Sequence, residues 1–475
     1  MTSLLDTSRE HHASPEFSTN VTANPGVMTR RRDQLLARFA DRIAVNPDLS
    51  RSLVSWQSNK HTPGFRWFKF KEGFSAGLVR YLLGFLDEPG HLLDPFAGTG
   101  IAPITAARAG WQGIGVEILP VGVNISNALL AAPAIDHSAF GRQATAFLKY
   151  VATAPGAPAV DWFPHIRITE KAFPPDGEAK IAAARNWLRR TEAAPETELL
   201  SLAAMAALED ASWTSKDGQY LRWDHRSGRK LKARMEKRQV LPYEVSLRNR
   251  IDNIAADLPA LAGRYEAEDV RIIEGSCYDV LPELSTDSVD AVITSPPYAN
   301  RYDYTRTYAL ELAWLRYDNQ GISALRQRLL SATVENRSKR EQLAADHGAA
   351  LARFDRHGAI VEITDALECA NQRGELPNPH VIRLVRNYFM EMSVVIAELS
   401  RVCRSGASVF MVNDNVQYHG EEVPVDLILS DLAEQCGFHT KAIWTLARGK
   451  GNASQQMGRF GRKELRKCVY WWVRR

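Results

Sequence analysis

Short apolar runs alternate with stretches of helical periodicity along most of this chain. Apolar residues at helical spacing predict helices over 101–109, 381–402 and 425–436. Strands that alternate with helices predict an α/β fold built on an open, mostly parallel sheet. The predicted strands, rich in Val, Ile, Leu and aromatic residues, are 92–93, 113–117, 270–275, 289–294, 407–412, 440–446 and 467–473.

The strand over 289–294 is followed at once by Ser295-Pro-Pro-Tyr298. Two prolines fix the backbone and remove two donors, so the strand is predicted to end in a rigid corner. Ligands of open α/β sheets bind at this carboxyl end. Ser295 and the proline carbonyls offer acceptors beside the flat ring of Tyr298, which suits a planar base carrying an exocyclic amine. A strand-ending turn with a buried tyrosine explains the same residues.

A second motif, Asp94-Pro-Phe-Ala-Gly-Thr-Gly100, follows the strand at 92–93 and leads into a helix. Its glycines let the backbone approach a ligand, and the helix amino end favours polar groups. The spacing G-x-G-x-x-G is absent. The next strand, 113–117, ends in Glu117, about 20 residues further on, where an adenosine ribose would be held.

In these motifs the chain resembles the S-adenosylmethionine-dependent amino-methyltransferases of nucleic acids, over roughly residues 61–135 and 268–475. The resemblance implies a Rossmann-like class I methyltransferase, with a seven-stranded, mostly parallel sheet ending in an antiparallel hairpin. It also implies that the turn at Asp94 wraps the methionine part of the cofactor and that Glu117 holds the ribose. The two motifs should then lie at neighbouring strand tips. The implied catalytic residues are Ser295, Pro296, Pro297 and Tyr298, and the implied cofactor-binding residues are Asp94, Phe96, Ala97, Gly98, Gly100, Glu117, Ile118, Ser276, Phe74 and Ser75.

One position departs from the family pattern. Family members commonly place an acid after the glycine that ends the third strand, where it receives the adenine amine, and this chain has Ser276 there. The adenine contact is therefore less well defined than the ribose contact.

The family motifs are separated by long additional segments. We expect a disordered leader over 1–28 and catalytic-domain segments over 29–131, 268–316 and 379–475. The two remaining segments, 132–267 and 317–378, are interpreted as insertions. The first is largely helical by pattern, with periodic segments at 181–188 and 196–208, and is the candidate target-recognition region.

Basic and aromatic residues gather within the first insertion and in the glycine-rich loop near the end of the chain. Cations interleaved with aromatic rings fit phosphate neutralisation and base stacking, although a solvated surface explains them too. The candidate nucleic-acid contacts are Lys216, Arg222, Trp223, Arg229, Lys230, Lys232, Arg459 and Arg462.

Composition adds few constraints. The 475 residues carry a net charge of +4, which permits a polyanionic partner without requiring one. The five cysteines have no C-x-x-C spacing, so neither a metal site nor a disulfide framework is predicted. No secretory signal or membrane span is visible in the sequence, and a cytoplasmic location follows by elimination.

The resemblance predicts methyl transfer to a flipped base in double-stranded DNA. Serine at the first motif position favours cytosine N4 over adenine N6. An enzyme acting on RNA, such as a tRNA amino-methyltransferase, and a non-catalytic protein that keeps the fold are the alternatives. A cognate restriction endonuclease, acting separately, is a possible partner.

Overall fold

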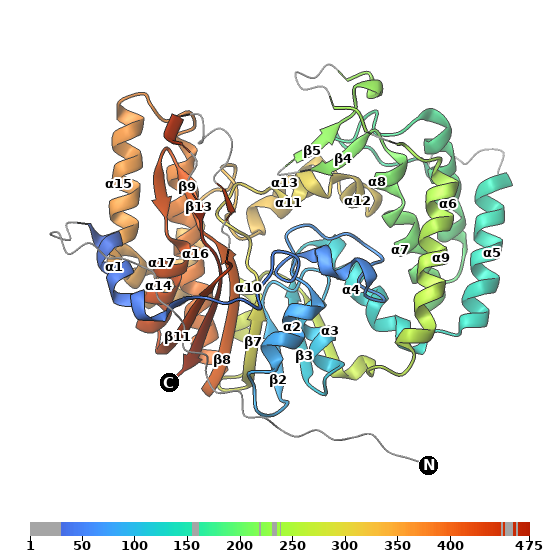
Figure 1. The fold of residues 1–475 in the computed structure, drawn as a ribbon. Helices are drawn as coiled ribbons and strands as arrows, with labels where there is room; N and C mark the ends of the chain where they lie inside the picture. Colours follow the sequence, from blue (N-terminus) through green and yellow to red (C-terminus); the bar gives the residue numbers. More distant parts are fainter. Residues whose placement is uncertain are drawn as a thin grey trace, which may run out of the picture.

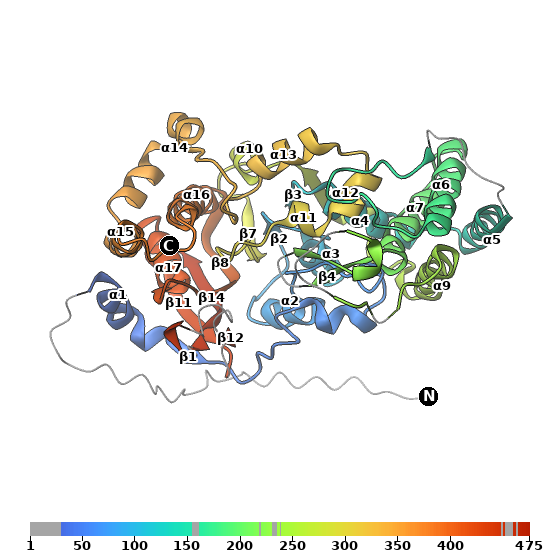
Figure 2. The ribbon, with the colours of Figure 1, turned by 90° about the horizontal axis from the view of Figure 1, so that it is seen from above.

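The computed structural model describes residues 30–153, 161–217, 220–229, 235–237, 239–447, 450–451, 459–461 and 464–475. One large sheet stands between two groups of helices, and a mostly helical body lies beside it (Figures 1 and 2). The predicted leader, residues 1–28, lies outside the described residues.

The sheet has eight strands in the order β1-β11-β14-β8-β7-β2-β3-β6. Neighbouring strands are parallel, except that β14 runs antiparallel to both β11 and β8. The predicted mostly parallel sheet with an antiparallel final hairpin is therefore present. The strands are β1 (Ile43–Val45), β2 (His91–Asp94), β3 (Gln112–Glu117), β6 (Val270–Glu274), β7 (Val289–Thr294), β8 (Cys403–Asp414), β11 (Phe438–Thr445) and β14 (Lys467–Arg474).

The prediction of seven strands was one short, because β1 adds an edge strand. The amphipathic pattern upstream of residue 43 forms helix α1 (Arg31–Phe39) and a short 3-10 turn before the chain becomes extended. β1 then pairs with β11 through three residues. A segment this short carries no alternating pattern from which a strand is predicted.

The central strands are buried on both faces, as expected for a parallel sheet covered by helices. On one face, Leu92 and Ala291 pack with α2 (Ala76–Leu83), α3 (Ile101–Ala107) and α4 (Pro120–Ala131). On the other face, Leu93 and Val292 pack with α10 (Cys277–Val280), α16 (His380–Val402) and α17 (Val425–Gln435). Adjacent residues point to opposite faces, so each strand contributes to both cores.

The described residues of 132–267, the predicted first insertion, form the body at the right of Figure 1. Its hydrophobic residues belong to the same buried cluster as α2–α4, and the Tyr265 hydroxyl donates to the Leu129 carbonyl at 2.5 Å. The first part of the basic and aromatic run forms a hairpin of β4 and β5. The elements are α5 (His137–Thr153), α6 (Pro175–Arg190), α7 (Pro195–Ala206), α8 (Leu208–Ala211), β4 (Thr214–Asp217), β5 (Tyr220–Trp223) and α9 (Tyr243–Leu261).

The second insertion contributes α13 (Asn319–Arg328), α14 (Arg340–Asp355) and α15 (Gly358–Gln372). The last two pack over α16 in the second core. The remaining short elements are α11 (Tyr304–Thr307), α12 (Ala309–Trp314), β9 (Val416–Tyr418), β10 (Glu421–Val423), β12 (Lys450–Gly451) and β13 (Glu464–Leu465). None of the helices in the described part of the chain combines the length and apolar character that a membrane span requires.

Candidate active site

The two motifs meet at the carboxyl ends of β2 and β7. These strands are parallel neighbours, with Leu92 opposite Ala291 and Leu93 opposite Val292. The Thr294 hydroxyl donates to Asp94 Oδ1 at 2.6 Å, which joins the last residue of one strand to that of the other. The prediction that the Asp94 turn and the Ser295 corner lie at neighbouring strand tips is confirmed.

The glycine turn depends on left-handed backbone conformations. Gly98 and Gly100 have φ angles of +57° and +73°, and a Cβ on Gly98 would lie 3.1 Å from the Phe70 ring. Gly98 N–H donates to Glu117 Oε2 at 2.6 Å. The turn after β2 is thereby fixed to the end of β3.

Two buried carboxyl groups face this turn. Asp94 accepts hydrogen bonds from Thr294 and from Phe96 N–H, and burial raises its pKa from 3.8 to about 7. Glu117 accepts from Gly98 N–H and, at 2.5 Å, from Leu119 N–H. Burial also raises the Glu117 pKa to about 7, and the nearby Asp94 adds to this rise. Removal from water disfavours the ionised form of both groups.

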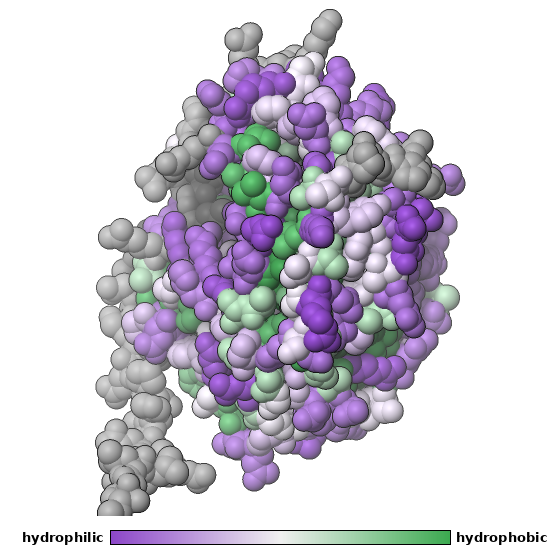
Figure 3. Space-filling view, turned by 90° about the vertical axis from the view of Figure 1, so that its right-hand side faces the viewer, coloured by the Kyte–Doolittle hydropathy of each residue, from purple (hydrophilic) through white to green (hydrophobic). Residues whose placement is uncertain are grey.

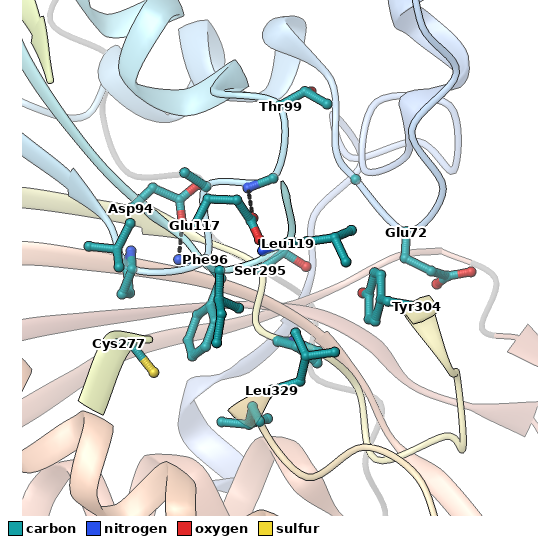
Figure 4. A pocket seen from close by; sticks show the side chains of 18 of the residues that line it. Glu72, Asp94, Phe96, Thr99, Glu117, Leu119, Cys277, Ser295, Tyr304 and Leu329 are labelled. Carbon is teal, nitrogen blue, oxygen red and sulfur yellow. Dashed lines mark hydrogen bonds between the residues drawn. The ribbon is translucent and has the colours of Figure 1, made fainter. Parts of the chain in front are cut away.

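A cavity of about 790 Å³, partly open to solvent, lies over this turn (Figure 4). Of the predicted cofactor-binding residues, Phe74, Asp94, Phe96, Ala97, Gly98, Glu117, Ile118 and Ser276 line it. Of the predicted catalytic residues, Ser295 and Pro297 line it. Residues from five segments separated in sequence therefore share one cavity.

Two predicted cofactor residues have structural roles and do not line this cavity. The Ser75 hydroxyl donates to the Leu53 carbonyl at 2.7 Å and accepts from Leu78 N–H, so it caps α2. Gly100 occupies the amino cap of α3. A hydroxyl with two backbone partners has little capacity left for a ligand.

Several cavity residues were not predicted. Phe70, Glu72 and Gly73 come from the loop before α2, and Arg328, Leu329 and Leu330 come from the end of α13 in the second insertion. Cys277 and Tyr304 also line the cavity, and Figure 4 shows Tyr304 beside Glu72. Glu72 has a left-handed φ of +63°, which is uncommon outside glycine.

Tyr298 faces a second cavity, which lies on the other side of Glu72. The residue is 6% exposed, and Lys467 Nζ lies 5.7 Å from the centroid of its ring. The Ser295 hydroxyl donates to the Tyr298 hydroxyl at 3.2 Å. Burial raises the pKa of Tyr298 well above 10, so the phenol keeps its proton. Pro296 is buried and lines neither of these two cavities.

The structure does not support a DNA contact for Lys216. Its ammonium is buried, lies 2.5 Å from Glu311 Oε1 and 3.5 Å from Glu209 Oε2, and has no open path to a phosphate. Arg229 also binds groups of the protein itself. Its guanidinium lies over the Trp223 ring and donates to the carbonyls of Arg167, Ile168 and Glu170. Trp223 itself is 8% exposed and its ring is covered by the Arg229 guanidinium, and unlike Tyr298 it lines neither of these two cavities.

The other predicted nucleic-acid contacts divide into two groups. Arg222 and Arg459 are exposed, and Arg459 donates to the Glu375 carbonyl at 3.4 Å. Lys230, Lys232 and Arg462 lie outside the described residues. Within the described part of the chain, no group of three or more His, Cys, Asp or Glu side chains is placed to hold a metal ion.

Close packing of α4 against the glycine turn depends on Gly122. A Cβ there would lie 2.4 Å from the Gly98 carbonyl oxygen and 2.9 Å from Glu117 Cγ. Gly122 lies too far from Gly100 to belong to the G-x-G-x-x-G spacing, so the sequence pattern does not single it out.

We expect Gly122→Ala to lower the free energy of unfolding by about 1–3 kcal/mol, because the turn must move to admit the methyl group. Affinity for S-adenosylmethionine, the cofactor implied by the resemblance, should fall with it. Thermal unfolding and titration calorimetry measure both effects. Gly141→Ala in α5 is the control, since nothing lies within 4 Å of its added Cβ. Equal behaviour of the two variants would contradict the role given to Gly122.

Three curated proteins are similar to the chain over most of its length. Type II methyltransferase M.AvaI of Nostoc sp. is 39% identical over 462 residues, which cover 94% of this chain and 93% of that protein. M.AvaI of Anabaena variabilis matches equally well. Type II methyltransferase M.BsoBI of Geobacillus stearothermophilus is 37% identical over 462 residues, covering 89% of this chain and 88% of that protein. No family model and no solved structure matches the chain.

Proposed function

The chain belongs to the type II DNA methyltransferases, and from this premise we propose that it methylates the exocyclic N4 of cytosine in duplex DNA. S-adenosylmethionine is the proposed methyl donor. Adenine N6 is the second candidate target, because the two amines present the same chemistry to a Ser-Pro-Pro-Tyr corner.

The hydrogen-bond acceptors and apolar side chains that line the first cavity suit S-adenosylmethionine. Glu117 and Asp94 offer carboxyl oxygens to hydroxyl and ammonium groups, while Phe96 and Ile118 supply an apolar surface for a base. Gly98 lines the cavity in a left-handed conformation and has no side chain, so the backbone can approach a ligand there. When bound, the cofactor supplies an electrophilic methyl group on a sulfonium sulfur. The residues of this chain bind it and orient the acceptor.

The Ser295 corner is proposed to activate the target amine. The lone pair of an exocyclic amine is delocalised into the ring, which makes the nitrogen a poor nucleophile. Hydrogen bonds from the amine to Ser295 Oγ and the Pro296 carbonyl would localise that pair for in-line attack. Serine in place of aspartate at this position favours cytosine N4.

The target base must leave the helix to reach the corner. Flipping costs a few kcal/mol, and stacking on an aromatic ring returns about 1–3 kcal/mol. Tyr298 is the ring proposed to receive the base, and residues 132–267 are proposed to read the flanking sequence, with Arg222 as an exposed candidate. A separate restriction endonuclease with the same target is the partner implied by a type II enzyme.

The observation that carries this proposal is the joining of Asp94 to Thr294, which sets Ser295 on the wall of the cofactor cavity. The experiment is to incubate the protein with S-adenosylmethionine and unmethylated duplex DNA or tRNA, then identify the methylated nucleosides by mass spectrometry. N4-methylcytosine in DNA alone is expected. N6-methyladenine would overturn the base assignment, methylated tRNA would favour the RNA alternative, and no methylation would favour a non-catalytic protein.

We expect Tyr298→Leu to lower kcat/KM for DNA about tenfold, because it removes the surface on which the base stacks. Affinity for S-adenosylmethionine should stay within about twofold of wild type, since Tyr298 does not line the first cavity. Tyr298→Phe keeps the ring and is the matched control. A leucine variant with wild-type kcat/KM would contradict the stacking role.

A further inference from the structure

The second cavity holds about 1020 Å³ and opens to solvent beside Tyr298. Phe70, Glu72 and Gly73 line both cavities, so the two spaces share one wall. The rest of the second lining includes four cations, Arg51, Lys69, Lys71 and Lys467, and the indole of Trp56. A concave site with this excess of positive charge is suited to an anion.

Trp56 supplies an independent sign of a ligand. The residue is 8% exposed, and within the described residues its indole Nε1–H is a buried donor with no acceptor. Buried donors are almost always paired in folded proteins. An unpaired donor in the wall of a basic cavity fits an oxygen that arrives with a ligand.

The charges in the cavity are arranged unevenly. Lys69 is exposed and makes no hydrogen bond or ion pair within the described residues, whereas Lys467 Nζ already lies 3.3 Å from Asp414. Glu72 likewise has no hydrogen-bond or ion-pair partner in the described chain, and it lies at the boundary with the first cavity. A carboxylate at this boundary repels a phosphate and attracts an amine. A nucleotide would therefore enter with its amine toward Glu72 and its phosphate toward the cations.

The two segments that form this wall are held together before any ligand arrives. Ser75 N–H and its hydroxyl both donate to the Leu53 carbonyl, at 3.3 and 2.7 Å. The Asn59 side chain donates to the Phe74 carbonyl and accepts from Ala76 N–H, each at 3.0 Å. Residues 51–59 and 69–76 thus form one rigid unit, which limits the entropy lost on binding.

We propose that this second cavity binds the phosphodiester next to the target base, with the Trp56 indole N–H and the Lys69 ammonium as its phosphate contacts. The site rests on the proposed function, since its ligand is the DNA strand that presents the amine. It assigns DNA binding to the segment before the glycine turn, in addition to the insertions.

The test compares Trp56→Phe and Lys69→Gln with Lys60→Gln in the full-length protein. Lys60 is exposed in the same segment but does not line the cavity, so it controls for the loss of one charge. The probe is a short duplex carrying a site mapped from DNA that the wild-type protein has methylated. Affinity is measured by fluorescence anisotropy over a series of salt concentrations.

Lys69→Gln should reduce the slope of log affinity against log salt by about 0.9, the value for one phosphate contact, and Lys60→Gln should leave it unchanged. Trp56→Phe should lower affinity about tenfold at every salt concentration, because it removes a hydrogen bond to a charged group and no cation. Affinity for S-adenosylmethionine should be unchanged in all three variants.

Equal slopes for Lys69→Gln and Lys60→Gln, or wild-type affinity for Trp56→Phe, would overturn the site. Lys69 is exposed, so its variant tests the site even if Trp56→Phe fails to fold. A wild-type protein that methylates no DNA would instead remove the proposed function. The two failures are therefore distinguishable.

Discussion

Replacing Lys216 with methionine is expected to lower the free energy of unfolding by about 3–5 kcal/mol, because it leaves a buried carboxylate without its cation. Lys216 Nζ lies 2.5 Å from Glu311 Oε1, and both side chains are almost fully buried. The rings of Phe68 and Tyr308 enclose the ammonium, with centroids at 4.7 and 5.1 Å. Thermal or denaturant unfolding measures the loss.

The matched control is the double variant Lys216→Met/Glu311→Leu, which removes both charges of the buried pair and leaves Glu209, whose side chain is 23% exposed. Replacing a buried ion pair by apolar residues is often neutral, so the double variant should regain most of the lost stability. If the single and double variants are equally unstable, the pair does not account for the effect. A correctly folded Lys216→Met protein with a smaller salt dependence of DNA binding would instead restore Lys216 as a phosphate contact.

The same lysine links the hairpin of β4 and β5 to the first cavity. Tyr308, beside Lys216, accepts a hydrogen bond from Lys71 N–H at 2.6 Å and stacks on Phe70, with ring centroids 5.0 Å apart. Phe70 lines both cavities. The destabilised variant should therefore also bind S-adenosylmethionine less tightly.

Lys216 shows why the predicted DNA contacts were less accurate than the predicted strands. A cation near aromatic residues in sequence can lie at a surface or inside an ion pair. Nothing in the sequence marks Glu209, seven residues away, or Glu311, 95 residues away, as a partner of Lys216. Strands such as β7 are identified by local composition, which is present in the sequence itself. Pairing between charges distant in sequence becomes visible only in the fold.

The first cavity was predictable in part because the family resemblance implies the order of the strands. Asp94 and Glu117 end two of these strands and Gly98 follows the first, so their meeting at one edge of the sheet is implied as well. The loop that carries Glu72 was placed near the cavity only through the resemblance, which named Phe74 and Ser75 of the same loop. Leu329 comes from a segment whose path no periodicity defines, and its sequence contains no feature that specifies which part of the sheet it covers.

Asp94→Asn is expected to stabilise the protein without its cofactor and to weaken cofactor binding. Asparagine keeps an acceptor oxygen for Thr294 and Phe96 but has no charge to bury. Folding raises the Asp94 pKa from 3.8 to about 7, so the folded protein binds this proton more tightly than the unfolded chain does. The stabilisation tied to the proton is complete below pH 3.8 and is lost as the pH rises to about 7.

The difference in stability between Asp94→Asn and wild type should therefore widen between these two pH values and stay constant above them. At pH 8, a value chosen about one unit above the raised pKa, the variant should be more stable by on the order of 2–4 kcal/mol. Melting temperatures over a pH series measure this. Asp87→Asn, an exposed change before β2, should show no such pH dependence.

Cofactor affinity should move in the opposite direction. The buried carboxylate is retained at a cost in stability, which is expected where an ionised group serves a ligand. If Asp94 binds the ammonium of the methionine part, Asp94→Asn should raise the Kd for S-adenosylmethionine about 100-fold, since a hydrogen bond between charged groups is lost. A variant that gains stability but keeps its affinity would show that Asp94 only joins β2 to β7. A variant that loses both stability and affinity would show that the Asp94 carboxylate is needed for the fold itself.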